Sequence, residues 1–449
     1  MPAAEVKYIF GNTDVLEYFN GPHFPAASSD AQLVKRYMSP MLESRSGTNI
    51  FFKNVDCKLG LLVVDNTFLL PTSVSTPLGC GDMMRASLPP SQEGRHHGFT
   101  NSATSAFVRF SGRGMGGTKS LQLNIFLSCL CRLLFSILSL VFCVTDFDNV
   151  VFINNFLLPT NLWPNFEELY SEDGLDNVFI QCLLLMKKAH PKRAVVFSSI
   201  DRLGPSLRIK KSLGRLNGRS VFSRQVHYQD AKDSKVWKKS STRGDLSYSK
   251  SLIESKSYHF YELKISIDSL GNYVGKNGKV VSTKTLNMLL EQIVHLCEKL
   301  RLLKYSQQGK PQFSSTFIRK AMLENFLSLN LLVKGPDQGR VPKSASLVHG
   351  VFGLWTRGGV LATPLLGYDI ALPQNAGLYR MLCLEIIQIG KKKQLLVNGG
   401  DGVGDFKRKR GAKTCTEYNV VCIHDSLPFY RRLPWIALEM ITRSLIPRE

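Results

Sequence analysis

One continuous run of predicted elements, residues 347–424, constrains the fold of this chain more than any other part. Two apolar stretches, 348–354 and 360–366, are separated by Thr356-Arg357-Gly358-Gly359, which is typical of a tight hairpin turn. A helix, a strand, a short helix and a further strand follow. This order predicts an α/β domain of mixed type that begins with a hairpin.

The turn between the hairpin and the following helix is the best candidate for a binding site. It reads Leu372-Pro373-Gln374-Asn375-Ala376-Gly377-Leu378-Tyr379, and it places backbone amides at the positive end of a helix dipole. Gly377 lets the backbone approach a ligand closely. We therefore expect the pyrophosphate of a nucleotide cofactor to bind Gln374, Asn375, Ala376, Gly377 and Leu378. Ordinary turn glycines are the alternative.

The rest of the chain also alternates helices and strands, in two halves that each end helix, strand, helix, strand. A length of 449 residues is enough for two cores. We expect a first domain over 1–235, with a long Gly- and Ser-rich insertion near 76–120, and a second, catalytic domain over 236–449. The polar and basic stretch 230–256 is predicted to be a linker with helical pieces. Helices are predicted over 283–303 and 314–328.

The positive charge of the chain favours anionic binding partners. The net charge is +22, and residues 201–250 alone hold 13 Lys and Arg against 4 Asp and Glu. Two further basic clusters are Lys391-Lys392-Lys393 and Lys407-Arg408-Lys409-Arg410. Such surfaces favour cofactor phosphates, nucleic acid or acidic lipid, and a plain solvated surface is the alternative.

Several classes of site are not expected. Ten cysteines contain no CxxC pair, so we predict neither a metal site nor a disulfide framework, and reduced thiols indicate a cytoplasmic protein. The apolar stretch 121–144 carries Arg132 near its middle, which favours a buried or interfacial helix over a stable membrane span. The glycine loop before it departs from a phosphate-binding P-loop, because Thr118 separates Gly117 from Lys119.

Several motifs together resemble the GNAT superfamily of acyl-CoA N-acyltransferases. More closely, they are similar to tandem GNAT-like proteins related to the Fem-type peptidoglycan aminoacyltransferases. The resemblance covers 149–445, and its pieces are 154–164, 223–226, 304–306, 311–313, 367–374, 377–380, 406–412, 417–418 and 427–435. It implies two tandem GNAT-like domains, each with a mixed, mostly antiparallel sheet flanked by helices.

The resemblance also implies a reaction, in which an amine attacks the carbonyl of a thioester, with acetyl-CoA or another acyl-CoA as the donor. Asp369 and Glu417 are then the candidate bases, and Tyr379 is the candidate acid for the leaving group. The cofactor would also contact Phe406, Lys407 and Arg410. A substrate cleft would be lined by Tyr368, Asn398, Arg224, Gln225, Lys304 and Tyr305.

Two alternatives remain open. A Fem-like transferase would take its acyl group from an aminoacyl-tRNA, and the basic stretch 201–250 would suit that donor. A catalytically degenerate fold would serve as a binding module. The sequence indicates neither the amine acceptor nor the oligomeric state.

Overall fold

The computed structural model describes residues 4–75 and 141–445, apart from short gaps at 46, 53–54, 56, 142–143, 148, 256, 305–310 and 337–338. The predicted insertion at 76–120 lies outside these residues, as does nearly all of the predicted helix at 121–144. In the described part, no helix has both the length and the apolar character needed to cross a membrane.

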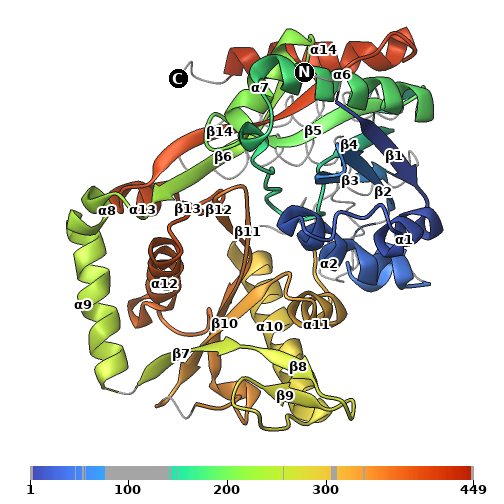
Figure 1. The fold of residues 1–449 in the computed structure, drawn as a ribbon. Helices are drawn as coiled ribbons and strands as arrows, with labels where there is room; N and C mark the ends of the chain where they lie inside the picture. Colours follow the sequence, from blue (N-terminus) through green and yellow to red (C-terminus); the bar gives the residue numbers. More distant parts are fainter. Residues whose placement is uncertain are drawn as a thin grey trace.

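A single twelve-stranded sheet runs through the molecule (Figure 1). Its order is β1-β2-β3-β4-β5-β14-β6-β13-β12-β11-β10-β7. The strands of the first half are β1 (Val6–Phe10), β2 (Cys57–Val64), β3 (Phe68–Ser75), β4 (Val150–Ile153), β5 (Ala194–Ile200) and β6 (Arg219–Asp230). Those of the second are β7 (Tyr258–Leu263), β10 (Ser328–Lys334), β11 (Val348–Arg357), β12 (Val360–Tyr368), β13 (Leu396–Asn398) and β14 (Lys413–Cys422). A separate hairpin joins β8 (Ile265–Ile267) to β9 (Tyr273–Gly275).

The pattern of antiparallel and parallel strand pairs is the same from both edges of the sheet. Each half contributes four antiparallel strands followed by one parallel pair, β4 with β5 and β12 with β13. The halves then exchange a strand, because β14 lies against β5 and β6 lies against β13. This arrangement is the tandem architecture that the sequence predicts, joined into one sheet. The boundary between 235 and 236 falls just after the exchanged strand β6, and it stays a prediction.

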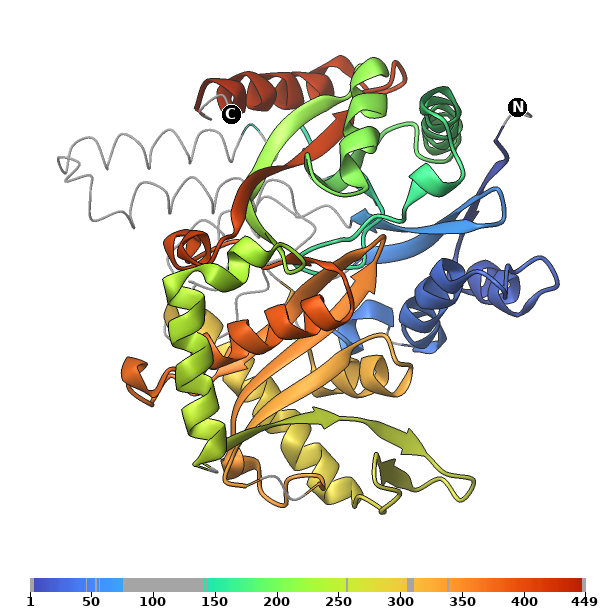
Figure 2. The ribbon, with the colours of Figure 1, turned by 60° about the vertical axis from the view of Figure 1, so that its left-hand side comes forward.

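Eleven α-helices of the described chain flank this sheet (Figures 1 and 2). The first half holds α1 (Asn12–Asn20), α2 (Ser29–Glu43), α6 (Glu172–Ala189) and α7 (Ser206–Arg215). The connection between the halves holds α8 (Ser234–Lys238) and α9 (Ser240–Glu254). The second half holds α10 (Thr283–Lys304), α11 (Ser315–Leu323), α12 (Leu378–Lys392), α13 (Gly404–Lys409) and α14 (Phe429–Leu445).

Helices α10 and α12 cover opposite faces of β10–β12. Along β11, Val351 packs in the cluster that contains α10, whereas the next residue, Phe352, packs in the cluster that contains α12. Successive strand residues point to opposite faces, and both faces here are covered, so the strands read as nearly continuous apolar runs. Helix α12 buries Met381, Leu382 and Ile386 against the sheet, as its apolar spacing predicts.

One prediction about local structure was wrong. The stretch predicted as a helix over 314–328 ends at Leu323, and strand β10 begins at Ser328. The short apolar run 327–333 does not distinguish a buried strand from a helix by its period. The stretch 230–256, predicted as a linker with helical pieces, forms α8 and then the fifteen-residue helix α9. Helix α9 runs alongside α12, as Figure 2 shows.

Candidate functional site

The parallel strands β12 and β13 separate after three paired residues. Val360, Leu361 and Ala362 pair with Leu396, Val397 and Asn398, and β13 then ends. Strand β12 continues to Tyr368 while still paired with β11 on its other side. One edge of residues 363–368 therefore pairs with no strand that the structure describes. Its backbone groups can bind a ligand that lies along the strand.

A bulge at this point explains why the strands diverge. Two residues of β12, Thr363 and Pro364, lie opposite the single residue Leu354 of β11. An extra residue bends its strand, and a proline cannot donate a hydrogen bond to a neighbouring strand. The bulge and the proline together turn β12 away from β13.

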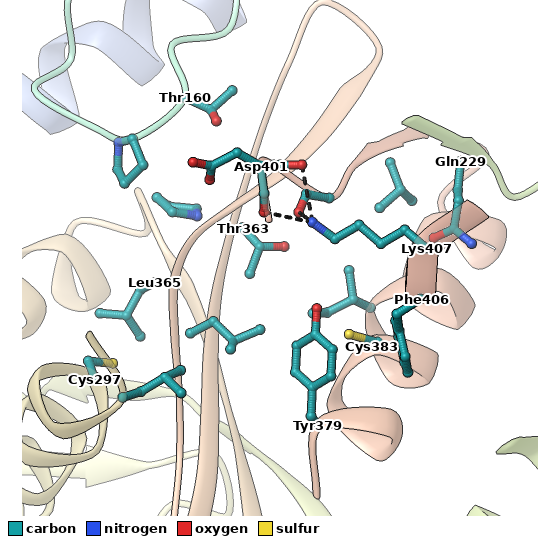
Figure 3. Close-up of a pocket in the computed structure, with 18 of the residues that line it drawn as sticks. Thr160, Gln229, Cys297, Thr363, Leu365, Tyr379, Cys383, Asp401, Phe406 and Lys407 are labelled. Atoms are coloured by element: carbon teal, nitrogen blue, oxygen red, sulfur yellow. Dashed lines mark hydrogen bonds between the residues drawn. The ribbon is translucent and has the colours of Figure 1, made fainter. Parts of the chain in front are cut away.

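A cavity of about 180 Å³ opens beside this divergence (Figure 3). It lies between β12, β13, α12, α10 and a loop of the first half. Most of its lining is apolar and includes Leu300, Leu365, Leu366, Ile386, Ile387 and Val397. A small number of polar groups in a largely apolar wall is the usual composition of a small-molecule site.

Two hydroxyl groups meet the cavity where the strands part. Tyr379, in the first turn of α12, points its hydroxyl into the cavity, and Thr363 reaches the same space from β12 (Figure 3). The Thr363 hydroxyl is buried and has no hydrogen-bond partner among the described residues. The Tyr379 ring is held between Tyr368 and Phe406, whose centroids lie 5.8 and 5.0 Å away.

Cys383 lines the cavity one turn after Tyr379. Burial raises the pKa of its thiol to about 11, against a hydrogen bond with Tyr379 that lowers it. The thiol is therefore protonated near neutral pH, and it is not an activated nucleophile.

The loop after β13 is fixed by Lys407 of α13. The Lys407 ammonium donates to the carbonyl oxygens of Gly399, Gly400 and Asp401 at 2.7, 3.1 and 2.9 Å. These bonds correspond to the three donors of an ammonium group. The Asp401 carboxylate lines the cavity and turns away from Lys407 toward the side where Thr160 lies (Figure 3). The structure thus shows Lys407 ordering this loop, whereas the sequence predicts a cofactor contact for it.

Arg410 is also fully engaged by the protein. Its guanidinium donates to both carboxylate oxygens of buried Asp245 on α9, at 2.5 and 3.1 Å. It donates to the carbonyl of Phe406 at 2.9 Å, and it lies 3.4 Å from the centroid of the Phe406 ring. Phe406, Lys407 and Arg410, which the sequence predicts as cofactor contacts, all line the cavity. The ion pair with Asp245 ties α9 to the end of α13.

Arg224 and Glu417 form a buried ion pair at the wall of the cavity. The Arg224 Nε and Nη2 donate to the two Glu417 carboxylate oxygens at 2.9 and 3.1 Å, and Nη2 also donates to the Thr160 hydroxyl at 2.9 Å. Burial works against the charge of Arg224, but Glu417 and Asp401 outweigh it and raise the pKa of the guanidinium. Burial raises the pKa of Glu417 against the opposing effect of Arg224. Arg224 and Thr160 line the cavity, and Glu417 lies behind them.

The predicted phosphate-binding bend lies outside the cavity. Gln374–Ala376 forms a 3-10 turn, and Gly377 has a left-handed backbone with φ of 65°. Tyr248 of α9 covers the bend: its hydroxyl donates to the Asn375 carbonyl at 2.8 Å, and its ring lies over Gly377. A phosphate at these amides requires Tyr248 to move. The helix start predicted as the cofactor site is therefore packed against α9.

The remaining predicted residues do not meet at one point. Asp369 lies 3.5 Å from the His349 ring nitrogen at the far end of β12, outside the cavity lining. Tyr368 contacts Tyr379, and the Asn398 side chain accepts a bond from the Gly400 amide at 2.8 Å. Gln225 is exposed, because it alternates with Arg224 along β6. Tyr305 and the Lys304 side chain lie outside the described residues.

Sequence reasoning missed five residues of this region: Tyr248, Arg301, Thr363, Cys383 and Asp401. Asp401 follows a short strand and two glycines, which is a signal for a functional loop. The Thr-Pro pair in the middle of an apolar strand is a signal for a bulge. Nothing in the sequence shows that Tyr248 contacts the bend, since 128 residues lie between Tyr248 and Gly377. No three His, Cys, Asp or Glu side chains of the described chain gather closely enough to hold a metal ion.

The equivalent gap in the first half is filled by its own chain. The loop after β4 folds back, with the Phe156 amide bonded to the Asn161 side chain at 2.7 Å and the Trp163 indole bonded to the Ser198 carbonyl at 3.1 Å. Phe156 and Trp163 are both buried. The cavity of about 180 Å³ therefore belongs to the second half, with the first half supplying one wall.

Comparison with known proteins gives fold neighbours. No family model matches the sequence, and neither does any curated protein. The similar solved structures include L-PGS from Bacillus licheniformis, 15% identical over 62% of this chain and 80% of its own, with a TM-score of 0.38. They include FemX, 8% identical over 60% of this chain and 80% of its own, with a TM-score of 0.40.

A tandem GNAT protein from the clavulanic acid biosynthesis pathway is 8% identical over 93% of this chain and 98% of its own, with a TM-score of 0.36. The solved structures similar to this chain thus include GNAT and Fem proteins, the groups that the sequence resembles. All three TM-scores are below 0.5, so the function proposed next rests on the site alone.

Proposed function

We propose that this protein is an N-acyltransferase, and that its second half transfers an acyl group from an activated ester or thioester to an amine. The supporting observation is the divergence of β12 and β13 at Ala362 and Asn398, which opens an apolar cavity where two hydroxyl groups converge. An acyl donor laid along the free edge of β12 would place its carbonyl beside Thr363 and Tyr379. The backbone groups of that edge, which pair with no described strand, would hold the donor in register.

The reaction needs three groups from the protein: a hydrogen-bond donor for the oxyanion, an acid for the leaving group and a base for the amine. The amine nitrogen attacks the carbonyl carbon, a C–N bond forms, and the C–S or C–O bond to the leaving group breaks. The Thr363 hydroxyl, which lacks a partner among the described residues, would donate to the oxyanion that develops on the carbonyl. Tyr379 would give its proton to the leaving thiolate or alkoxide.

The proton lost by the amine needs an acceptor. Asp401 meets this need best, because its carboxylate lines the cavity and its loop is fixed by Lys407. The predicted bases Asp369 and Glu417 are less well placed, since neither lines the cavity and each already pairs with a cation or a histidine. Asp401 is therefore the base that we propose.

An acyl-CoA is the first candidate donor, because the apolar walls suit an acyl chain and its thioester. The pyrophosphate of an acyl-CoA does not fit at the bend Gln374–Gly377, because Tyr248 covers that bend. That observation favours a second candidate, an aminoacyl-tRNA, whose acylated end carries no pyrophosphate. The excess of cations in residues 201–250 would suit an RNA backbone.

A pair of donor assays tests the proposal. Release of free thiol from acetyl-CoA and longer acyl-CoAs is measured with a mixture of amines, and loss of the aminoacyl group from charged tRNA is measured in parallel. We expect amine-dependent turnover of one donor class, and its loss when Cys383→Phe fills the cavity. Gln388→Phe on the exposed side of the same helix is the control and should keep activity. Turnover that survives Cys383→Phe would place the reaction elsewhere.

A further inference from the structure

The wall of the cavity that the first half supplies differs from the wall that faces the donor. Residues from β12 and α12 form an apolar surface with two hydroxyl groups. The first half contributes Pro159, Thr160, Arg224 and Gln229. An amine acceptor that approaches the donor carbonyl therefore contacts this more polar wall.

Arg224 is held in one orientation on that wall. Its Nε and Nη2 are fixed by Glu417 and Thr160 at 2.9 to 3.1 Å. Nη1 is the guanidinium nitrogen that makes no hydrogen bond with the described residues. The side chain is 15% exposed, and Arg224 lines the cavity. An arginine fixed on one side and open on another is preorganised to bind an anion.

The charges around Arg224 agree with this role. Glu417 is buried and compensates the charge that Arg224 brings into the protein. Arg301 of α10 lines the same cavity, and burial lowers the pKa of its guanidinium. Asp401 lines the cavity, and its negative charge raises the pKa of the Arg224 guanidinium. An ammonium group can therefore lie at Asp401 while an anionic group of the same small molecule lies at Arg224.

We infer that the acceptor is a small amine that carries a carboxylate or phosphate next to its amino group, with the anionic group bound by Arg224 and the amino group held at Asp401. This inference rests on the proposed transferase function and names the class of its acceptor. Amines without an anionic neighbour leave the Arg224 Nη1 unpaired, and they should bind more weakly.

The experiment measures binding without any turnover. The rate at which a maleimide alkylates Cys383 is followed by mass spectrometry at constant ionic strength, with glycine, aminomethylphosphonate or glycinamide as the competing probe. We expect glycine or aminomethylphosphonate to protect Cys383 at concentrations about tenfold or more below those needed for glycinamide. If glycine binds more tightly than aminomethylphosphonate, the anionic group of the acceptor is a carboxylate, and the opposite order indicates a phosphate.

Two variants keep the test valid if one of them folds poorly. Arg224→Lys retains the charge, and Arg224→Met combined with Glu417→Gln avoids a buried unpaired carboxylate. Both should lose the preference for anionic probes, while the exposed Arg202→Met control should keep it. Each variant is compared only after its unfolding transition shows that it is folded, because an unfolded chain would also lose the preference.

Equal protection by all three probes, or a preference that survives in both Arg224 variants, would overturn the inference. A protein that shows the expected protection but transfers no acyl group would instead refute the proposed function.

Discussion

Tyr248 of α9 lies directly on Gly377 at the start of α12, so that a Cβ at position 377 would come within 2.4 Å of the Tyr248 ring. The same tyrosine donates to the Asn375 carbonyl at 2.8 Å, and Arg380 stacks over it at 4.8 Å from the ring centroid. Helix α9 therefore closes the helix start that the sequence marks as an anion site. Access to that site depends on how firmly α9 is held.

This contact predicts coupling between the two positions. Gly377→Ala should lower the free energy of unfolding by about 1–3 kcal/mol, because it adds backbone strain at a φ of 65° and a clash with Tyr248. In a Tyr248→Ala background the clash is gone, so the same substitution should cost only the backbone strain. Denaturant titration of the four proteins measures the difference. Equal costs in both backgrounds would show that Tyr248 does not pack on Gly377 in solution.

Tyr379→Phe should separate catalysis from packing. The ring contacts with Tyr368 and Phe406 remain, so the melting temperature should change little, whereas loss of the proton donor should lower kcat by about a hundredfold or more. KM should stay nearly constant, because the hydroxyl acts on the leaving group. Steady-state kinetics with Tyr368→Phe as the control checks this. A loss of stability with unchanged kcat would assign Tyr379 a purely structural role.

Lys407→Met should loosen the loop after β13. The substitution removes three bonds from a side chain that is 8% exposed and should cost about 1–3 kcal/mol of stability. The Gly399 amide, which bonds to the His227 carbonyl at 2.9 Å, should exchange its hydrogen faster. Lys409→Met, on the exposed side of α13, should change neither quantity. Unchanged exchange at Gly399 in Lys407→Met would contradict the role given to Lys407.

His190 should make stability fall in acid. Burial lowers its pKa from 6.5 to about 4, and its ring bonds to the Tyr8 hydroxyl at 2.9 Å. Between these pH values the unfolded chain binds a proton that the folded chain does not, so stability is lost as pH drops from about 6.5 toward 4. His190→Gln should remove about 1–3 kcal/mol of that loss, measured by denaturant titration at several pH values. An unchanged slope in His190→Gln would contradict this role of His190.

Local sequence predicted most of the second half but not its long-range contacts. The hairpin, the glycine turn and the amphipathic helix occupy the predicted places because each depends on a period or a turn within a few residues. Tyr379 and Phe406, which the sequence predicts as site residues, line the same cavity, and their roles stay predictions. The Arg410–Asp245 pair spans 165 residues and the Arg224–Glu417 pair spans 193, and no local pattern encodes such contacts.

The exchange of strands β6 and β14 explains why the sequence does not predict which residues line the cavity. Because β6 and β14 cross between the halves, Arg224 of the first half becomes a wall of the second half's cavity. The sequence predicts Asp369 and Glu417 as bases, but Asp369 pairs with His349, Glu417 pairs with Arg224 in the middle of β14, and neither lines the cavity. Asp401 enters it because Lys407 folds the glycine loop toward the cavity.

The most direct measurement of the central claim is protection of Cys383 by the donor itself. Alkylation of Cys383 is followed at about pH 9, with acyl-CoA or charged tRNA present and with buried Cys182 as an internal reference. If the acyl donor occupies the gap between β12 and β13, the donor that is turned over should slow alkylation of Cys383 and leave Cys182 unchanged. A donor that is turned over while Cys383 reacts at its original rate would show that the acyl group binds elsewhere.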